Sequence, residues 1–187
     1  GNMMSQDGII INSGFNRYQG RLVLDQTVSD KLKAGMNVNY TATKTYGTFA
    51  STTSQGNTSS LMYSIWGYRP VTGDPETDVS IIDEPFDPAV DPMNDYRVNP
   101  VISNKNEYNP RFGNTLTAYA YVEYKPIKHL TLRVTGGLTK IAVRQDIFNN
   151  SNTRLGNPKS SVQGVNGSVD NAETTNLLNE NTLTYAR

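Results

Sequence analysis

The chain has 187 residues, no cysteine, and 17 basic side chains against 17 acidic ones, so it is formally neutral. A neutral chain lacks the excess positive charge that is typical of nucleic-acid-binding proteins. The lack of cysteine excludes disulfides and thiolate metal sites. Hydrophobic residues make up only 36% of the chain, and abundant Asn, Thr, Ser, Gly and Tyr favour strands and turns. No run approaches the ~18 apolar residues of a membrane helix, whereas alternation can hide a membrane strand.

The first predicted element is a long hairpin over residues 15–46. Apolar residues share one parity along its first arm, and the pattern resumes after a short link of Ser29, Asp30 and Lys31. A period of two sends successive side chains to opposite faces of a strand, so this hairpin has one apolar and one charged face. The apolar set is Tyr18, Leu22, Leu24, Val28, Leu32, Ala34, Met36, Val38, Tyr40 and Ala42.

A long insertion over residues 47–112 follows, which we interpret as extracellular. Within it, residues 58–66 (TSSLMYSIW) break the alternation and place apolar side chains on one helical stripe behind a Ser/Thr cap. This pattern predicts a short helix. The stripe either anchors the loop by burial, which we favour, or forms a wall over a barrel mouth. It consists of Leu61, Met62, Ile65 and Trp66.

The insertion also contains a proline-rich acidic run and several aromatic residues. The carboxylates could bind calcium, but their spacing fails the calcium-loop pattern, so we predict a solvated acidic loop and no metal site. Aromatic faces beside Asn and Asp suit sugars or peptides, although they also pack loops onto themselves. The candidate ligand-binding residues are Trp66, Tyr68 and Tyr96. The acidic run comprises Asp83, Glu84, Asp87, Asp91 and Asp95.

A second hairpin is predicted over residues 113–144, with a short link around Pro126 to His129. Gly136 and Gly137 in its return arm predict a bend or bulge. An extracellular loop over 145–178 and the start of another strand over 179–187 complete the chain. The apolar parity of this hairpin is Leu116, Ala118, Ala120, Val122, Tyr124, Leu130, Leu132, Val134 and Leu138.

Short links alternate with very long connections, and each arm exceeds the ~5 to 6 residues of an ordinary strand. Outer-membrane barrels combine tight periplasmic turns with long outer loops. The sequence therefore predicts an all-β fold, an antiparallel meander of long hairpins that is a fragment of a large outer-membrane β-barrel. Its charged parity would face a hydrated lumen or a plug. That parity includes Arg17, Arg21, Asp25, Lys33, Glu123 and Arg133.

Catalytic patterns are weak. The single histidine, His129, falls in a tight link and lacks the partners of a catalytic triad or a metal site. No glycine-rich phosphate loop precedes a helix, and no two carboxylates are fixed at a defined separation. We therefore predict a protein that is not an enzyme and needs no cofactor.

Three segments resemble the SusC/RagA family of TonB-dependent outer-membrane transporters of Bacteroidetes. They are QDGIIINSGFNRYQGRLVLDQTVSDKLKAGMNVNYT, SSLMYSIWGYRPV and LLNENTLTYAR. The resemblance implies a 22-stranded barrel with a plug, energised by TonB and covered by a SusD-like lipoprotein that captures glycans or peptides. This chain has too few strands for that barrel and no recognisable plug, so we expect an internal slice of it.

Two further expectations concern the isolated fragment and the alternatives to transport. Unpaired strand edges and an uncovered apolar face should make the isolated fragment self-associate. The principal alternative to a transporter is a soluble or surface-anchored carbohydrate-binding β-sandwich with Trp66 and nearby tyrosines as its platform, and a third is a structural adhesin.

Overall fold

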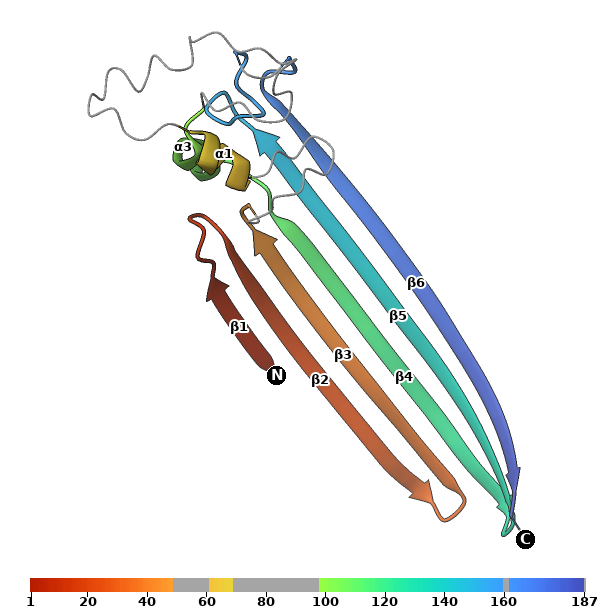
Figure 1. The fold of residues 1–187 in the computed structure, drawn as a ribbon. Coiled ribbons are helices and arrows are strands. Elements are labelled where there is room, and N and C mark those ends of the chain that lie inside the picture. The colour runs from red at the N-terminus through yellow and green to blue at the C-terminus, as the bar shows by residue number, and fades with distance from the viewer. Residues whose placement is uncertain (49–60, 69–97, 160–161, 187) are drawn as a thin grey trace.

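The computed structural model describes residues 1–48, 61–68, 98–159 and 162–186. It contains a six-stranded antiparallel sheet in which every strand pairs with its neighbours in the sequence (Figure 1). This confirms the predicted all-β meander of long hairpins. The strands are β1 (Asn2–Asp7), β2 (Gly14–Ser29), β3 (Leu32–Tyr46), β4 (Arg111–Ile127), β5 (Leu130–Asn149) and β6 (Asn166–Tyr185).

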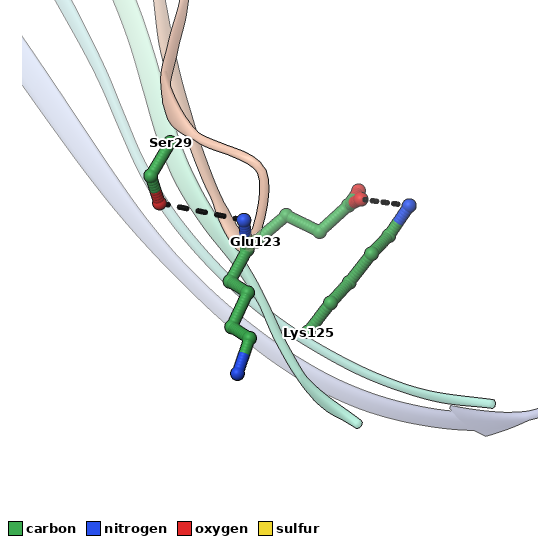
Figure 2. Close-up of polar contacts among 4 residues, drawn as sticks. Ser29, Glu123 and Lys125 are labelled. Carbon is green, nitrogen blue, oxygen red and sulfur yellow. Dashed lines mark hydrogen bonds and ion pairs between the residues drawn. The ribbon is translucent and has the colours of Figure 1, made fainter. Parts of the chain in front are cut away.

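The two tight turns lie at one end of the sheet. The connection between β1 and β2 lies at the other, together with helices α1 (Leu61–Gly67) and α3 (Pro100–Asn106) (Figure 1). We call these the turn end and the loop end. At the turn end, the Ser29 hydroxyl accepts a hydrogen bond from the Lys31 amide, and Lys125 pairs with Glu123 at 3.6 Å (Figure 2). The Lys125 amide also donates to the Lys31 carbonyl, which joins the first turn to the end of β4.

Strand pairing keeps the two parities on separate faces. Leu22 pairs with Val38, Val38 with Ala118, and Ala118 with Leu138, so one row of apolar side chains crosses four strands. We call this the apolar face, which carries the even-numbered residues of β2 to β5. The opposite side, with Arg21 and Asn39 in the neighbouring row, is the charged face.

The apolar face has no second layer packed against it in the described parts of the chain. Leu22, Leu24 and Val122 are 58%, 52% and 47% exposed. Among the described residues, the buried hydrophobic core consists of Val98 alone. A two-layer sandwich would seal such side chains in its interior. The described residues therefore form a single sheet with an open apolar side, as a barrel fragment would.

The apolar face has a limited height. On β3 it runs from Leu32 to Ala42 and is followed by Lys44, which lies in one row with Phe112 and Arg144. Those 11 residues match the ~9 to 11 residues of a tilted membrane strand. Above this apolar band, both faces of the sheet carry polar side chains. None of the described helices is long and apolar enough to cross a membrane.

The structure corrects the predicted loop over 145–178. β5 continues to Asn149 and β6 already begins at Asn166, so the connection is residues 150–165. The sequence NGSVDNAETTN in β6 shows no clear alternation. Residues 166–172 pair above the rows of the apolar band, and Glu173 and Thr175 place polar side chains in its top rows. β1 and α3 were also not predicted, whereas the helix expected over 58–66 is observed as α1.

Of the bend or bulge predicted at Gly136 and Gly137, the bulge is wrong. Both residues pair in continuous register with β4 and β6, and the irregularities lie beside the turns, between Thr27 and Ser29 and between Tyr124 and Ile127. The hairpin 15–46 and the position of His129 in a turn are confirmed, and the His129 ring contacts the Ala186 carbonyl at 2.8 Å.

Candidate functional site

A groove of about 360 Å³ lies on the charged face near the loop end. Its strand residues come from β3, β4 and β5 and all share the parity of that face, because rows of paired residues bring them together. The groove is therefore a product of strand register rather than of a single loop. Its walls are formed by Thr43, Thr45, Gly47, Asn109, Arg111, Gly113, Thr115, Ile141, Val143 and Gln145.

The groove combines hydroxyl, amide and guanidinium groups. The Thr43 hydroxyl donates to the Gly113 carbonyl at 3.2 Å, and the Gln145 amide donates to the Asn109 side-chain oxygen at 2.9 Å. These bonds fix the orientation of two polar side chains before any ligand arrives, which lowers the entropic cost of binding. Gly113 leaves room for the Thr43 hydroxyl, which would lie 2.7 Å from a β-carbon at that position.

One arginine lines the groove, and a second lies on the neighbouring strand. Arg111 lines it, and Arg17 pairs with Thr43 from the adjacent strand. The Arg17 Nε atom is buried without a hydrogen-bond partner, and neither arginine forms an ion pair with an acidic residue of the described ranges. Arg21, on the same face of β2 and nearer the turn end, donates from Nε to the Asn37 oxygen at 3.2 Å.

Nearer the turn end, the charged face has a different character. Tyr121 donates to the Asp25 carboxylate at 2.8 Å, and the Arg133 guanidinium lies 4.2 Å from the centre of the Tyr121 ring. Tyr121 pairs with Gly35, where a β-carbon would lie 2.5 Å from the ring. Opposite charges are therefore compensated within this part of the face.

A polar scaffold supports the loop end. The Asn99 side chain caps α3 by accepting from the Val101 and Ile102 amides at 2.9 and 3.3 Å. Glu107, at the other end of α3, accepts from the Thr48 and Ser103 hydroxyls at 2.6 and 3.0 Å. The helix is thereby tied to the end of β3.

A second hollow of about 490 Å³ lies where α1, α3 and the β1–β2 connection meet, and it is almost entirely apolar. Asn104 is its polar exception, 3% exposed and with both side-chain amide atoms buried and unbonded. The hollow is lined by Ile9, Ile10, Ile11, Leu61, Met62, Ile65, Pro100, Val101 and Asn104.

Comparison with known proteins finds two receptors that match nearly the whole chain. TonB-dependent receptor P3 of Formosa agariphila is 26% identical over 193 residues, covering 99% of this chain and 18% of the receptor. TonB-dependent receptor P26 of the same organism is 27% identical over 190 residues, covering 98% and 17%. The similarity supports a fragment of a TonB-dependent receptor. No protein-family model matches the chain.

The chain thus spans less than a fifth of the length of these relatives. Both are receptors by name, which fits the expectation that the chain is not an enzyme. In the part of the chain that the structure describes, no cluster of three or more His, Asp or Glu side chains could hold a metal ion. The acidic run of residues 83–95 lies outside that part.

Two of the three predicted ligand residues lie in the described structure, and their role stays a prediction. Trp66 is 63% exposed on α1, Tyr68 follows the helix and donates its amide to the Ser64 carbonyl, and Tyr96 lies outside the described residues. Neither Trp66 nor Tyr68 lines either hollow. Of the helical stripe, Leu61, Met62 and Ile65 line the apolar hollow, but Ile65 is 47% exposed, so anchoring of the loop by burial stays a prediction.

The groove residues were not predicted from the sequence because half of them are threonines and glycines, which carry no distinctive chemical signal. A signal was present: Thr41, Thr43 and Thr45 form an unbroken run of hydroxyls on one parity of β3. Strand register, which places Arg111 and Gln145 beside that run, could not be derived from the alternation alone.

Proposed function

We propose that the chain forms part of the wall and the outer loops of a TonB-dependent nutrient transporter in the outer membrane. One observation carries the proposal, namely a single-layer sheet whose long strands expose one apolar and one charged face. In a large barrel, lipid covers the first face and water fills the lumen beside the second. The similarity to two TonB-dependent receptors supports the same function.

The proposal includes finer points that rest on the three family-like segments. The transporter would be of the SusC/RagA type, its substrate an oligosaccharide or a peptide, and its outer partner a SusD-like lipoprotein, while TonB supplies energy through the intact protein. The chain would perform no chemistry. Its loop end would face the cell exterior, where Trp66, Tyr68 and Tyr96 would be available to substrate. Co-purification of a lipoprotein with the tagged intact protein tests the partner.

Spin labels at paired rows of the sheet test the membrane arrangement. Single cysteines at Leu22, Val38 and Ala118 would carry labels on the apolar face, and cysteines at Arg21, Asn39 and Thr117 would carry them on the charged face. In the intact protein reconstituted into liposomes, the first set should be accessible to oxygen and the second to a water-soluble nickel chelate. Labels on the apolar face that neither reagent reaches would show a protein interior and reject the proposal.

A further inference from the structure

We propose that the groove on the charged face binds an anionic oligosaccharide, one whose sugar rings carry carboxylate or sulfate groups. This deepens the proposed function, on which it rests, by naming a substrate class and the residues that select it. The starting observation is an uneven distribution of charge along the charged face.

The half of the charged face nearer the loop end carries excess positive charge. It comprises four rows of paired residues, from Phe15–Thr45–Arg111 to Arg21–Asn39–Thr117. These rows contain three arginines, and where they continue onto β6 they contain one acidic residue, Asp170. The three arginines are Arg17, Arg21 and Arg111. Nearer the turn end, Asp25, Glu123 and Glu180 lie among Lys33 and Arg133, so that half is close to balanced.

The arginines beside the groove lack acidic partners. Arg17 and Arg111 form no ion pair with a described carboxylate, and the buried Nε of Arg17 has no acceptor. A buried charged donor without an acceptor is costly for the folded protein, and a bound anion would remove that cost. The planar guanidinium group binds carboxylates and sulfates through two parallel hydrogen bonds.

The spacing of the arginines suits a single ligand. Arg17 and Arg111 lie on β2 and β4, with β3 between them, which separates them by about 10 Å across the sheet. Thr43 and Thr45 lie in the intervening strand. A ligand lying over these hydroxyls would therefore place anionic groups within reach of both arginines.

The remaining groups favour a sugar over an acidic peptide. Threonine hydroxyls and the Gln145 and Asn109 amides can both donate and accept, as the hydroxyls of a sugar ring require. Ile141 and Val143 add a small apolar surface for the C–H face of a ring. We therefore expect a polyhydroxylated anion to satisfy more of the groove's polar groups than an acidic peptide would, because each sugar ring carries several hydroxyls that both donate and accept.

Binding to the intact receptor in detergent tests the inference. The titrated probes are a galacturonate hexamer for carboxylates, a heparin-derived hexasaccharide for sulfates, and neutral maltohexaose. We expect at least one anionic probe to bind more tightly than maltohexaose, with an affinity that falls as salt rises. Arg17→Gln and Arg111→Gln should each weaken that probe by about 10- to 100-fold, since each removes a hydrogen bond to a charged group.

Two further variants separate specific recognition from general charge. Arg111→Lys keeps the charge but not the planar fork, so its affinity should fall between those of the native protein and Arg111→Gln. Lys44→Gln removes a positive charge at the same height on the opposite face, between Thr43 and Thr45 in the sequence, and should change the affinity less than twofold.

The inference would be overturned by equal binding of maltohexaose, by equal losses for Lys44→Gln and Arg111→Gln, or by failure of both anionic sugars to bind. Tighter binding of hexaglutamate than of either anionic sugar would instead assign the groove to acidic peptides. The spin-label pattern does not depend on ligand, so a failure here leaves the membrane arrangement separately testable.

Discussion

The ring of Tyr119 lies directly over Gly137, its partner on the neighbouring strand, so that a β-carbon on Gly137 would be 2.6 Å from two ring carbons and 3.2 Å from Leu178 Cβ. The adjacent Gly136 points to the opposite face, and a β-carbon there would meet nothing within 4 Å. Two neighbouring glycines thus have different roles, and only one of them makes room for a side chain.

Gly137→Ala should therefore destabilise the intact protein by about 1–3 kcal/mol, because the Tyr119 ring must move to accommodate the methyl group. Gly136→Ala is the matched control and should be neutral or slightly stabilising. Urea titration of folding in liposomes measures both. Equal effects of the two substitutions would show that the Tyr119 contact does not limit this position.

The height of the apolar band predicts a depth-dependent cost of charge. Ala118 lies in the middle row, beside Val38 and Leu138, whereas Asn114 lies on the same strand and face near the polar boundary. Ala118→Arg should cost about 2–4 kcal/mol and Asn114→Arg about 0–1 kcal/mol, as arginine does at the midplane and interface of a bilayer. The same folding titration in liposomes applies, and similar costs at both sites would contradict the band.

Thr153 organises the connection between β5 and β6. It is fully buried, its hydroxyl donates to the Asn150 carbonyl at 2.8 Å, and it accepts from the Gly156 amide at 3.0 Å. Thr153→Val keeps the shape but removes both hydrogen bonds of the hydroxyl, and leaves the Gly156 amide with the Thr153 carbonyl at 3.3 Å as its acceptor. We expect a cost of about 1 kcal/mol to the local fold. Hydrogen exchange should speed up in residues 150–159, whereas Thr153→Ser should preserve protection.

Asn99 controls α3 in a similar way. Its side-chain oxygen accepts from the first free amides of the helix, and Pro100 occupies the first helical position. Asn99→Ala should destabilise the helix by about 1 kcal/mol, and Asn99→Asp should retain most of the capping. Limited proteolysis near α3 distinguishes the two variants, and equal cleavage would mean that tertiary contacts, not the cap, hold the helix.

The alternation of apolar and polar residues predicted the hairpins well. Wherever one face of a sheet meets an apolar environment and the other meets water, every second residue must be apolar. The presence of Leu22 and Val38 on one face follows from that constraint. The upper half of β6 could not be predicted in this way, since its two faces meet the same polar environment. For α3, the Asn99–Pro100 pair is a recognisable helix start, but too few apolar residues follow it to show a helical period.

The candidate groove was less predictable than the fold. Its residues are separated by up to about a hundred positions in the chain, from Thr43 to Gln145, and only the register of three strands brings them together. The aromatic residues selected from the sequence had a sound chemical rationale, but exposure of Trp66 on a short helix does not by itself create a concave surface.

The length of β5 has a consequence for how cargo would arrive. Its 20 residues extend about 66 Å, or about 50 Å in height at the usual tilt, twice the ~25 Å of the hydrocarbon layer. The pore entrance would accordingly project well beyond the bilayer surface. One end of a long polymer could then be captured while the rest of it remained clear of the surrounding lipid headgroups.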